Sequence, residues 1–145
     1  MLVGSYEHNL DSKGRLALPA PFRKEIEGSD LIVVPSPTEK ALFVFDPVKF
    51  ELWLDSLFER TGGFNPRSRK DVAIRKRILG SSAPVVLDSA GRLSIPKQLR
   101  DYAALTKEVT VLGNYDHAEL WDSACYAEHM AELSDADFEE FFFTE

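Results

Sequence analysis

Two stretches of the chain carry the same pattern of apolar and polar positions. Residues 10–19 read LDSKGRLALP and residues 87–96 read LDSAGRLSIP, with seven of the ten positions identical. In each copy a glycine, Gly14 or Gly91, follows three polar or small residues. This predicts a tight β-hairpin turn in which the glycine takes a positive φ. Beyond the turn, aliphatic residues alternate with arginine or a small residue, so the strand should bury its aliphatic side chains and turn its arginine to the opposite face.

The segments after the two copies also follow one order. A proline ends each strand and suits the first position of a short helix. Two strands and an aspartate typical of a helix N-cap come next in both halves. The predicted helices span 19–26 and 96–105, the predicted strands span 30–34, 41–45, 108–113 and 117–121, and the N-caps are Asp46 and Asp122.

The helices behind the two aspartates carry apolar stripes, which predicts that they pack against the core or another subunit. Between the halves we expect a helix that opens near Asn65-Pro66, has Ile74 and Ile78 on its inner edge and ends at Gly80. The tail 134–145 mixes acids with four phenylalanines without a clear period, and we interpret it as a loosely held terminus whose rings dock on a neighbour. The stripes are Phe50, Trp53, Leu54 and Leu57 in the first half and Tyr126, Met130 and Leu133 in the second.

The duplication has a physical reason. A hairpin with one short helix cannot bury its aliphatic face alone, whereas two copies in one chain can interlock around one core. We therefore expect a mainly β fold with helices, of the α+β class, with pseudo-twofold symmetry. The expected parts are a first unit at 1–60, a basic linker helix and joint at 61–83, a second unit at 84–134 and an acidic aromatic tail at 135–145.

Composition narrows the class of protein. A chain of 145 residues with 44% hydrophobic residues can bury a core. No apolar run reaches the roughly 20 residues of a membrane span and the N-terminus lacks a signal pattern, so we expect a soluble cytoplasmic protein without a membrane partner. The single cysteine, Cys125, excludes an internal disulfide and a multi-cysteine metal site, and is expected to be a small apolar filler.

Charge is unevenly distributed along the chain. The net charge is −7, but residues 1–100 hold 16 basic and 12 acidic residues, whereas residues 101–145 hold 1 basic and 12 acidic residues. The two balances are therefore +4 and −11. Such asymmetry allows a basic face on an acidic protein, and the local field is what steers a polyanion.

The repeated D-S-x-G-R motif has a structural interpretation. Asp11 and Asp88 would cap their own turns and pair with Arg15 and Arg92. An exposed ion pair of this kind stabilises a fold by only about 0–1 kcal/mol. That is too little to explain by itself why the motif is present twice.

A catalytic interpretation fits poorly. Paired aspartates that share a proton occur in aspartic proteases, but Lys13 and Ala90 stand where that signature needs glycine. The chain also lacks a Gly-x-Ser-x-Gly motif, a Gly-rich phosphate loop and a His-Glu-x-x-His motif. His8, His117 and His129 are isolated in the sequence and are expected to be strand or surface residues rather than ligands. We therefore expect no enzyme activity, catalytic residue, metal, cofactor or small-molecule substrate.

A nucleic-acid contact is the third interpretation. In both copies a strand-borne arginine is followed eight residues later by a helix-borne arginine, and such side chains can read guanine edges or clamp phosphates. Paired sites on a symmetric body also suit a double helix. The candidate DNA-binding residues are Arg15, Lys13, Arg23, Lys24, Arg92, Lys97 and Arg100, and the turn-structuring residues are Asp11, Gly14, Asp88 and Gly91.

Several of these segments resemble a known family. GRLSIPKQLR, at 91–100, is similar to the hallmark of AbrB-type DNA-binding domains, in which a Gly-Arg strand runs through Ile-Pro into a helix. Two D-x-x-x-R motifs, at 11–15 and 88–92, together with LTKEVTVLG and ELWD within 105–122, resemble the MraZ family of bacterial transcriptional regulators. The similarity spans nearly the whole chain.

The resemblance implies two tandem swapped-hairpin AbrB-like units that form one pseudo-twofold barrel body, assembled with other copies into a closed ring. It implies binding to double-stranded DNA at repeated promoter boxes upstream of the family's own operon of cell-division and cell-wall genes, usually as a repressor, and hence association with the nucleoid. Arg15 corresponds to the family's main DNA-contact candidate, and Arg23 and Lys24 correspond to the basic pair of AbrB-type domains.

Two further points stay open at the sequence level. The first copy is more basic, because Ala90 replaces Lys13 and Asp101 replaces Lys24 in the second, so we expect the N-terminal half to lead DNA contact. The bases of the linker helix form either a solvated face or a surface that pairs with the acidic half of a neighbouring subunit. The alternative function is a non-enzymatic, ring-forming assembly protein whose motif arginines are structural.

Overall fold

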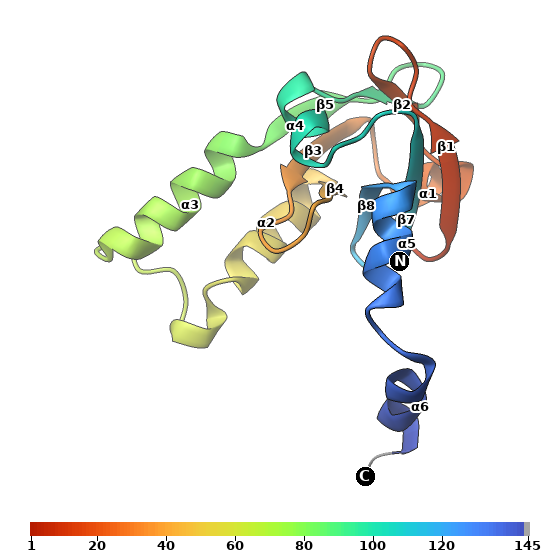
Figure 1. Ribbon diagram of the computed structural model, residues 1–145. Helices are drawn as coiled ribbons and strands as arrows, with labels where there is room; N and C mark the ends of the chain where they lie inside the picture. Colours follow the sequence, from red (N-terminus) through yellow and green to blue (C-terminus); the bar gives the residue numbers. More distant parts are fainter. Residues whose placement is uncertain (144–145) are drawn as a thin grey trace.

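The computed structural model describes residues 1–143, and within this range the chain has an α+β fold (Figure 1). The described elements follow the same order in both halves, as the sequence predicts. The strands are β1 (Ser5–Asn9), β2 (Arg15–Ala17), β3 (Asp30–Pro35), β4 (Leu42–Phe45), β5 (Ala83–Val86), β6 (Arg92–Ser94), β7 (Glu108–Asn114) and β8 (His117–Asp122). The helices are α1 (Ala20–Glu25), α2 (Pro47–Ser56), α3 (Arg69–Ser81), α4 (Lys97–Tyr102), α5 (Ser123–Ala131) and α6 (Asp135–Phe143), with a 3₁₀ turn η1 (Glu59–Thr61).

The two halves exchange their hairpin strands. Six strands form one antiparallel sheet in the order β1-β7-β8-β4-β3-β5, and β2 pairs with β6 in a separate ribbon. Strand β1 of the first half therefore pairs with β7 of the second, and β5 of the second half pairs with β3 of the first. The sheet order reads the same from both ends when the halves are interchanged, which confirms the swapped hairpins and the pseudo-twofold symmetry.

The ribbon crosses the centre of this symmetry. Leu16 lies opposite Leu93, with Arg15 opposite Ser94 on one side and Ala17 opposite Arg92 on the other. Leu16 and Leu93 are fully buried, as the alternation predicts. They belong to one continuous core with residues of both halves, so the duplicated hairpins stabilise each other rather than folding around separate cores.

The helices that follow the last strand of each half, α2 and α5, differ in how much they bury. Helix α2 begins behind the N-cap Asp46 and buries Phe50 and Leu54 in a second apolar cluster, against which Trp53 and Ile78 also pack. Helix α5 begins behind Asp122, also as predicted, but it buries none of its residues. Of the predicted stripe, Met130 lies on α5 and Leu133 lies two residues beyond its end. Both are about half exposed, so within the described chain they are not part of the core.

Several helices differ in extent from the sequence prediction. Helix α4 ends at Tyr102 rather than at Leu105, and Ala104 just beyond it has a positive φ of 52°. Helix α3 starts at Arg69 rather than near Asn65-Pro66, because Ser68 Oγ accepts the backbone N–H of Asp71 and caps the helix there. It ends at Ser81, one residue beyond Gly80. The tail, in which the sequence pattern predicted no regular element, forms helix α6 over residues 135–143. Ser134 Oγ caps this helix by accepting the backbone N–H of Asp137.

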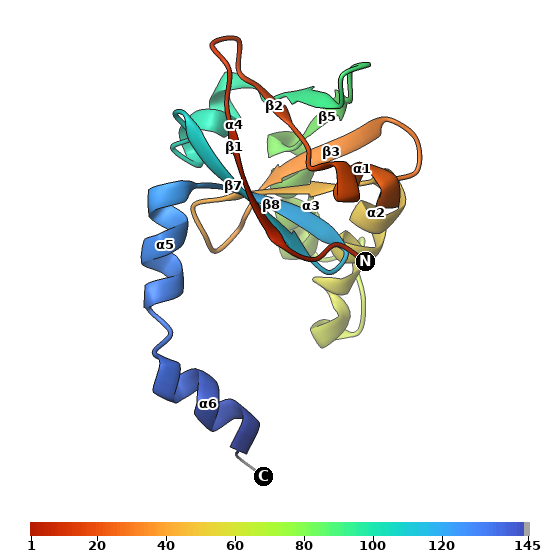
Figure 2. The ribbon, with the colours of Figure 1, turned by 90° about the vertical axis from the view of Figure 1, so that its right-hand side faces the viewer.

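The loops and the terminal helices lie at opposite ends of the molecule. Figure 1 shows the β1–β2 and β5–β6 loops together at one end of the body, and Figure 2 shows the space between them. Helix α3 extends from the body on one side, and α5 and α6 extend away from the loop end. No helix within residues 1–143 is long and apolar enough to cross a membrane.

Candidate nucleic-acid interface

The first hairpin loop is held by one aspartate. Asp11 Oδ1 accepts the backbone N–H groups of Lys13 and Arg15, both at 2.9 Å, and Asp11 Oδ2 accepts Arg15 Nε at 2.7 Å. The turn is closed by the backbone N–H of Gly14, which donates to Asp11 O at 3.0 Å. A carboxylate with these three donors fixes both the loop and the direction of the guanidinium.

The second loop repeats this geometry. Asp88 Oδ1 accepts the backbone N–H groups of Ala90 and Arg92 at 2.9 Å, and Asp88 Oδ2 accepts Arg92 Nε at 2.9 Å. Gly91 N donates to Asp88 O at 2.9 Å. The structural interpretation of the motif is therefore confirmed in both copies, because each aspartate caps its own turn and pairs with its arginine.

Both carboxylates are stabilised in the charged form. The backbone N–H of Arg15 is the strongest influence on Asp11 and lowers the pKa of that carboxyl below its ordinary value, against a smaller opposing effect of desolvation. The Arg15 guanidinium lowers it further. Asp88 has a lowered pKa for the same reasons, with Arg92 as the donor. At neutral pH the loops therefore keep their ion pairs.

Each loop also contacts the other half of the chain through its glycine. Gly14 and Gly91 have φ values of 76° and 75°, the left-handed region in which a Cβ is strained. A Cβ at Gly14 would lie 2.8 Å from Arg100 Cζ, and a Cβ at Gly91 would lie 2.6 Å from Arg23 Cδ. The helix-borne arginine of each half thus lies directly over the turn of the opposite half.

Backbone hydrogen bonds tie the same partners together. Leu18 N donates to Gly91 O at 3.0 Å, and Ile95 N donates to Gly14 O at 2.9 Å. Arg100 Nε donates to Ile95 O at 3.0 Å, which holds its side chain beside the first loop. The loops and the arginine-bearing helices are therefore fixed relative to one another across the pseudo-twofold axis.

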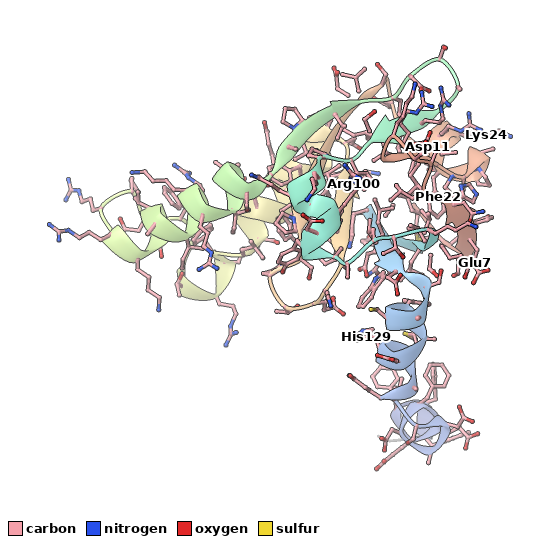
Figure 3. The ribbon with its side chains drawn as sticks, turned by 45° about the horizontal axis from the view of Figure 1, so that its top comes forward. Glu7, Asp11, Phe22, Lys24, Arg100 and His129 are labelled. Carbon is pink, nitrogen blue, oxygen red and sulfur yellow. The ribbon has the colours of Figure 1, made fainter. Side chains whose placement is uncertain are left out.

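The swap sorts the candidate cations into two composite groups. Lys13 and Arg15 of the first loop lie with Arg100 of α4, and Arg92 of the second loop lies with Arg23 of α1. Each group therefore draws residues from both halves of the chain. Figure 3 looks toward this end of the molecule and shows Lys24 at the outer edge of α1 and Arg100 on α4.

The motif arginines are paired but accessible. The side chains of Arg15 and Arg92 are 30% and 37% exposed, and their Nε atoms are the ones bound to the aspartates. Within residues 1–143 no hydrogen bond joins either pair of terminal Nη groups to another residue. The ion pair therefore orients each guanidinium while it leaves the outer nitrogens available to a ligand.

The remaining candidates are surface lysines. Lys13 and Lys24 are exposed, the first in the loop and the second in the last turn of α1. Lys97 is exposed on α4 and its Nζ pairs with Asp101 Oδ2 at 2.9 Å. These residues can add charge near a polyanion without the fixed geometry that the loop arginines have.

A buried polar cluster at the sheet was not identified from the sequence. Glu119 accepts hydrogen bonds from Trp121 Nε1 at 2.9 Å and Asn114 Nδ2 at 2.7 Å, and it lies 3.2 Å from His117 Nε2. His117 Nδ1 lies 2.7 Å from an Asp116 carboxylate oxygen. The only sequence signal is the spacing His-x-Glu-x-Trp, which places the three side chains on one face of β8.

His117 and Glu119 of this cluster favour their charged forms. Burial acts to lower the His117 pKa, but the Glu119 and Asp116 carboxylates outweigh it, so that pKa is raised above 6.5. Burial acts to raise the Glu119 pKa, but hydrogen bonds from His117, Asn114 and Trp121 lower it below 4.5. The cluster is thus a satisfied polar network within the fold.

Metal-ligating groups and the cysteine thiol are the remaining reactive features of the described chain. Within residues 1–143 no group of three or more His, Cys, Asp or Glu side chains is arranged to hold a metal ion. Burial, with Asp122 nearby, raises the pKa of the Cys125 thiol, which opposes thiolate formation.

Comparison with known proteins gives a consistent result. The model of the family described as "MraZ protein, putative antitoxin-like" matches residues 1–71 and again residues 78–142, one match for each half. The chain is 37% identical over 143 residues to the "Transcriptional regulator MraZ" of Salinispora arenicola (strain CNS-205), covering 97% of this chain and 96% of the relative.

Relatives from other bacteria carry the same name. The chain is 38% identical to the "Transcriptional regulator MraZ" of Treponema pallidum (strain Nichols) over 94% of this chain and 88% of that protein. It is also 38% identical to the protein of that name from Corynebacterium jeikeium (strain K411), over 96% of both chains. These names support a role in transcriptional regulation rather than in catalysis, and together with the two family matches they show that this chain belongs to the MraZ family.

Proposed function

We propose that this protein is a sequence-specific DNA-binding regulator that represses its own operon of cell-division and cell-wall genes. It binds repeated boxes in the promoter through the two composite groups at the loop end, and it does so as a ring of several copies at the nucleoid. The observation that carries the proposal is the matched pair of loops, in which an aspartate orients each partly exposed arginine and leaves its outer nitrogens available.

The roles of the residues follow from their geometry. Arg15 and Arg92 have a fixed direction, so they suit bidentate contact with guanine edges or phosphates. Arg23 and Arg100 lie over the turns of the opposite halves and would contact the adjacent backbone. Lys13, Lys24 and Lys97 would contribute charge that draws the DNA in and makes binding salt-dependent.

A binding titration with DNA from upstream of the protein's own gene tests this proposal. The wild type should bind that DNA more tightly than a scrambled sequence, and Arg15→Ala should weaken binding by roughly 1–3 kcal/mol and reduce discrimination. Arg60→Ala is the matched control, because Arg60 is an exposed arginine of η1, outside both loops and their helices. Arg60→Ala should bind like the wild type.

The paired state of the arginines also favours a second candidate function. If Arg15 and Arg92 serve only their aspartates, the protein is a ring-forming assembly protein in which these residues are structural. In that case Arg15→Ala lowers the stability of the fold or the assembly size and leaves DNA binding unchanged. Measuring unfolding, mass and DNA affinity on the same variant separates the two functions.

A further inference from the structure

Helix α6 has an apolar face that the rest of the described chain does not cover. Phe138, Phe141 and Phe142 lie on one side of the helix and are 55%, 78% and 65% exposed. Within residues 1–143 their ring contacts are with one another. Figures 1 and 2 both show α6 extending away from the sheet. Because an isolated nine-residue helix is marginal in water, this face calls for a partner surface.

A second surface of the molecule offers an apolar groove. An open groove of about 530 Å³ lies where the end of β3 and helices α2, α3 and α4 meet. Its walls are mostly apolar or aromatic, which suits the insertion of rings. The lining includes Pro35, Pro37, Trp53, Ile74, Ile78 and Tyr102.

Charge favours α6 as the occupant of this groove. Arg77 lines the groove, and Lys70 lies on the same face of α3, one turn before Ile74. Helix α6 carries Asp135 and Asp137 in its first turn, one on each side of its phenylalanine face. An acidic amphipathic helix therefore meets opposite charge at the rim and apolar surface inside.

Another exposed hollow lacks this complementarity. Met1, Leu52 and Tyr115 border a space of about 340 Å³ together with Lys49 and Asp116. The Met1 α-ammonium is already paired with Glu25 at 3.0 Å, and Lys49 is offset by Asp116, so this hollow offers an acidic helix no unpaired basic group. The groove beside α3 is the better match for α6.

We propose that α6 of one copy docks into the groove between α2 and α3 of the next copy. Phe138 and Phe142 would insert beside Trp53 and Ile78, with the acids of α6 near the bases of α3. This inference rests on the assembly part of the proposed function and specifies its interface. Because the two surfaces differ, the contact is heterologous and repeats from copy to copy until the chain of subunits closes.

Light scattering of the full-length protein tests the docking. The double variant Phe138→Ser/Phe142→Ser should weaken self-association by about thirtyfold or more and leave monomers at a concentration at which the wild type is assembled. Phe143→Ser is the matched control, because Phe143 is 84% exposed on the far side of the same helix. It should assemble like the wild type. A double variant with the wild-type mass would overturn the docking.

A mixing experiment tests the head-to-tail direction. Ile74→Asp should also give monomers, and its side chain is 39% exposed, so the core should not be disturbed. Mixed with the double variant, it should form a dimer that joins one intact α6 to one intact groove and grows no further. A mixture that stays monomeric contradicts the docking.

A charge swap tests the ionic part of the same contact. Arg77→Glu should weaken assembly, and combining it with Asp137→Lys should restore assembly.

DNA titrations of the same proteins keep this inference separate from the proposed function. If the double variant keeps the wild-type mass while the wild type binds its upstream DNA, the docking is wrong and the proposed DNA-binding function stands. If the wild type itself is a monomer, both the docking and the proposed ring are wrong. If the wild type assembles as described but does not bind the upstream DNA, the docking stands and the regulator proposal falls.

Discussion

At the loop end of the molecule the two halves are almost interchangeable, whereas at the helical end they have opposite character. The loops 11–15 and 88–92 make the same hydrogen bonds with the same arginine direction. Helix α3 presents bases and lines an aromatic groove, while α6 presents acids and exposed phenylalanines. The two matching loops suit one kind of contact made twice. The unlike helices suit two different surfaces that meet between copies.

Truncation of the central leucines tests the symmetry of the core and should have the largest effect. Leu16 and Leu93 are fully buried and lie opposite each other in the ribbon. Leu16→Ala and Leu93→Ala should each cost about 2–5 kcal/mol of unfolding free energy, to a similar extent, because their surroundings are equivalent. The double variant should lose less than the sum, since the two residues share one cavity. Urea unfolding measures this, and a severalfold difference between the single variants would show that the ribbon is not symmetric.

Substitution of the loop glycines separates backbone strain from the contact with the opposite arginine. Gly14→Ala and Gly91→Ala should each cost roughly 1–2 kcal/mol for the left-handed backbone and should also displace Arg100 or Arg23. Gly28→Ala is the matched control, because Gly28 has φ of 76° and a Cβ added there would meet no atom within 4 Å. Thermal unfolding should show a larger loss at Gly14 and Gly91 than at Gly28, and DNA affinity should fall only in the loop variants. An equal loss of stability at all three glycines would mean that the contacts of Arg100 and Arg23 with the loops do not stabilise the fold.

The polar cluster around His117 should make the stability of the fold depend on pH. The raised His117 pKa contributes stability that is fully present below about pH 6.5 and is lost as pH rises through the folded-state pKa. The lowered Glu119 pKa contributes stability above about pH 4.5 that is lost as pH falls through its folded-state pKa. The wild type should therefore lose stability as the pH rises above about 6.5, and His117→Gln should flatten that part of the curve. Urea unfolding over a range of pH measures this. If the unfolding free energy of the variant falls with pH as steeply as that of the wild type, His117 is not the cause of the pH dependence.

Giving the second loop the lysine that only the first loop carries should have the smallest effect. Lys13 of the first loop corresponds to Ala90 of the second. Ala90→Lys should tighten binding to all DNA sequences about equally and steepen the salt dependence by about one unit of slope, because it adds one phosphate contact. Lys13→Ala should do the reverse. Binding titrations over a range of salt concentrations measure both, and no change in slope would place the second loop away from the DNA backbone.

Local patterns predicted the loops and strands well because each was determined by residues close in sequence. The alternation of Leu16 and Leu18 with polar or small residues specified the buried face, and Asp46 and Asp122 marked helix starts that the structure confirms. The contact of Arg100 with Gly14 was not predicted, because it joins residues 86 positions apart through the swap. The hydrophobic pattern did not predict the start of α3 or the helix α6, because both helices begin at a serine cap, Ser68 or Ser134, rather than at a change in apolar period.

The most direct test of the account compares Arg15→Ala, Arg92→Ala and the double variant in one titration against the protein's own upstream DNA. The pseudo-twofold geometry predicts that each single variant weakens binding by roughly 1–3 kcal/mol and that the double variant loses more than either. Arg60→Ala, measured beside them, should bind as tightly as the wild type. If the double variant binds the upstream DNA as tightly as the wild type does, the two loops are not the DNA contact.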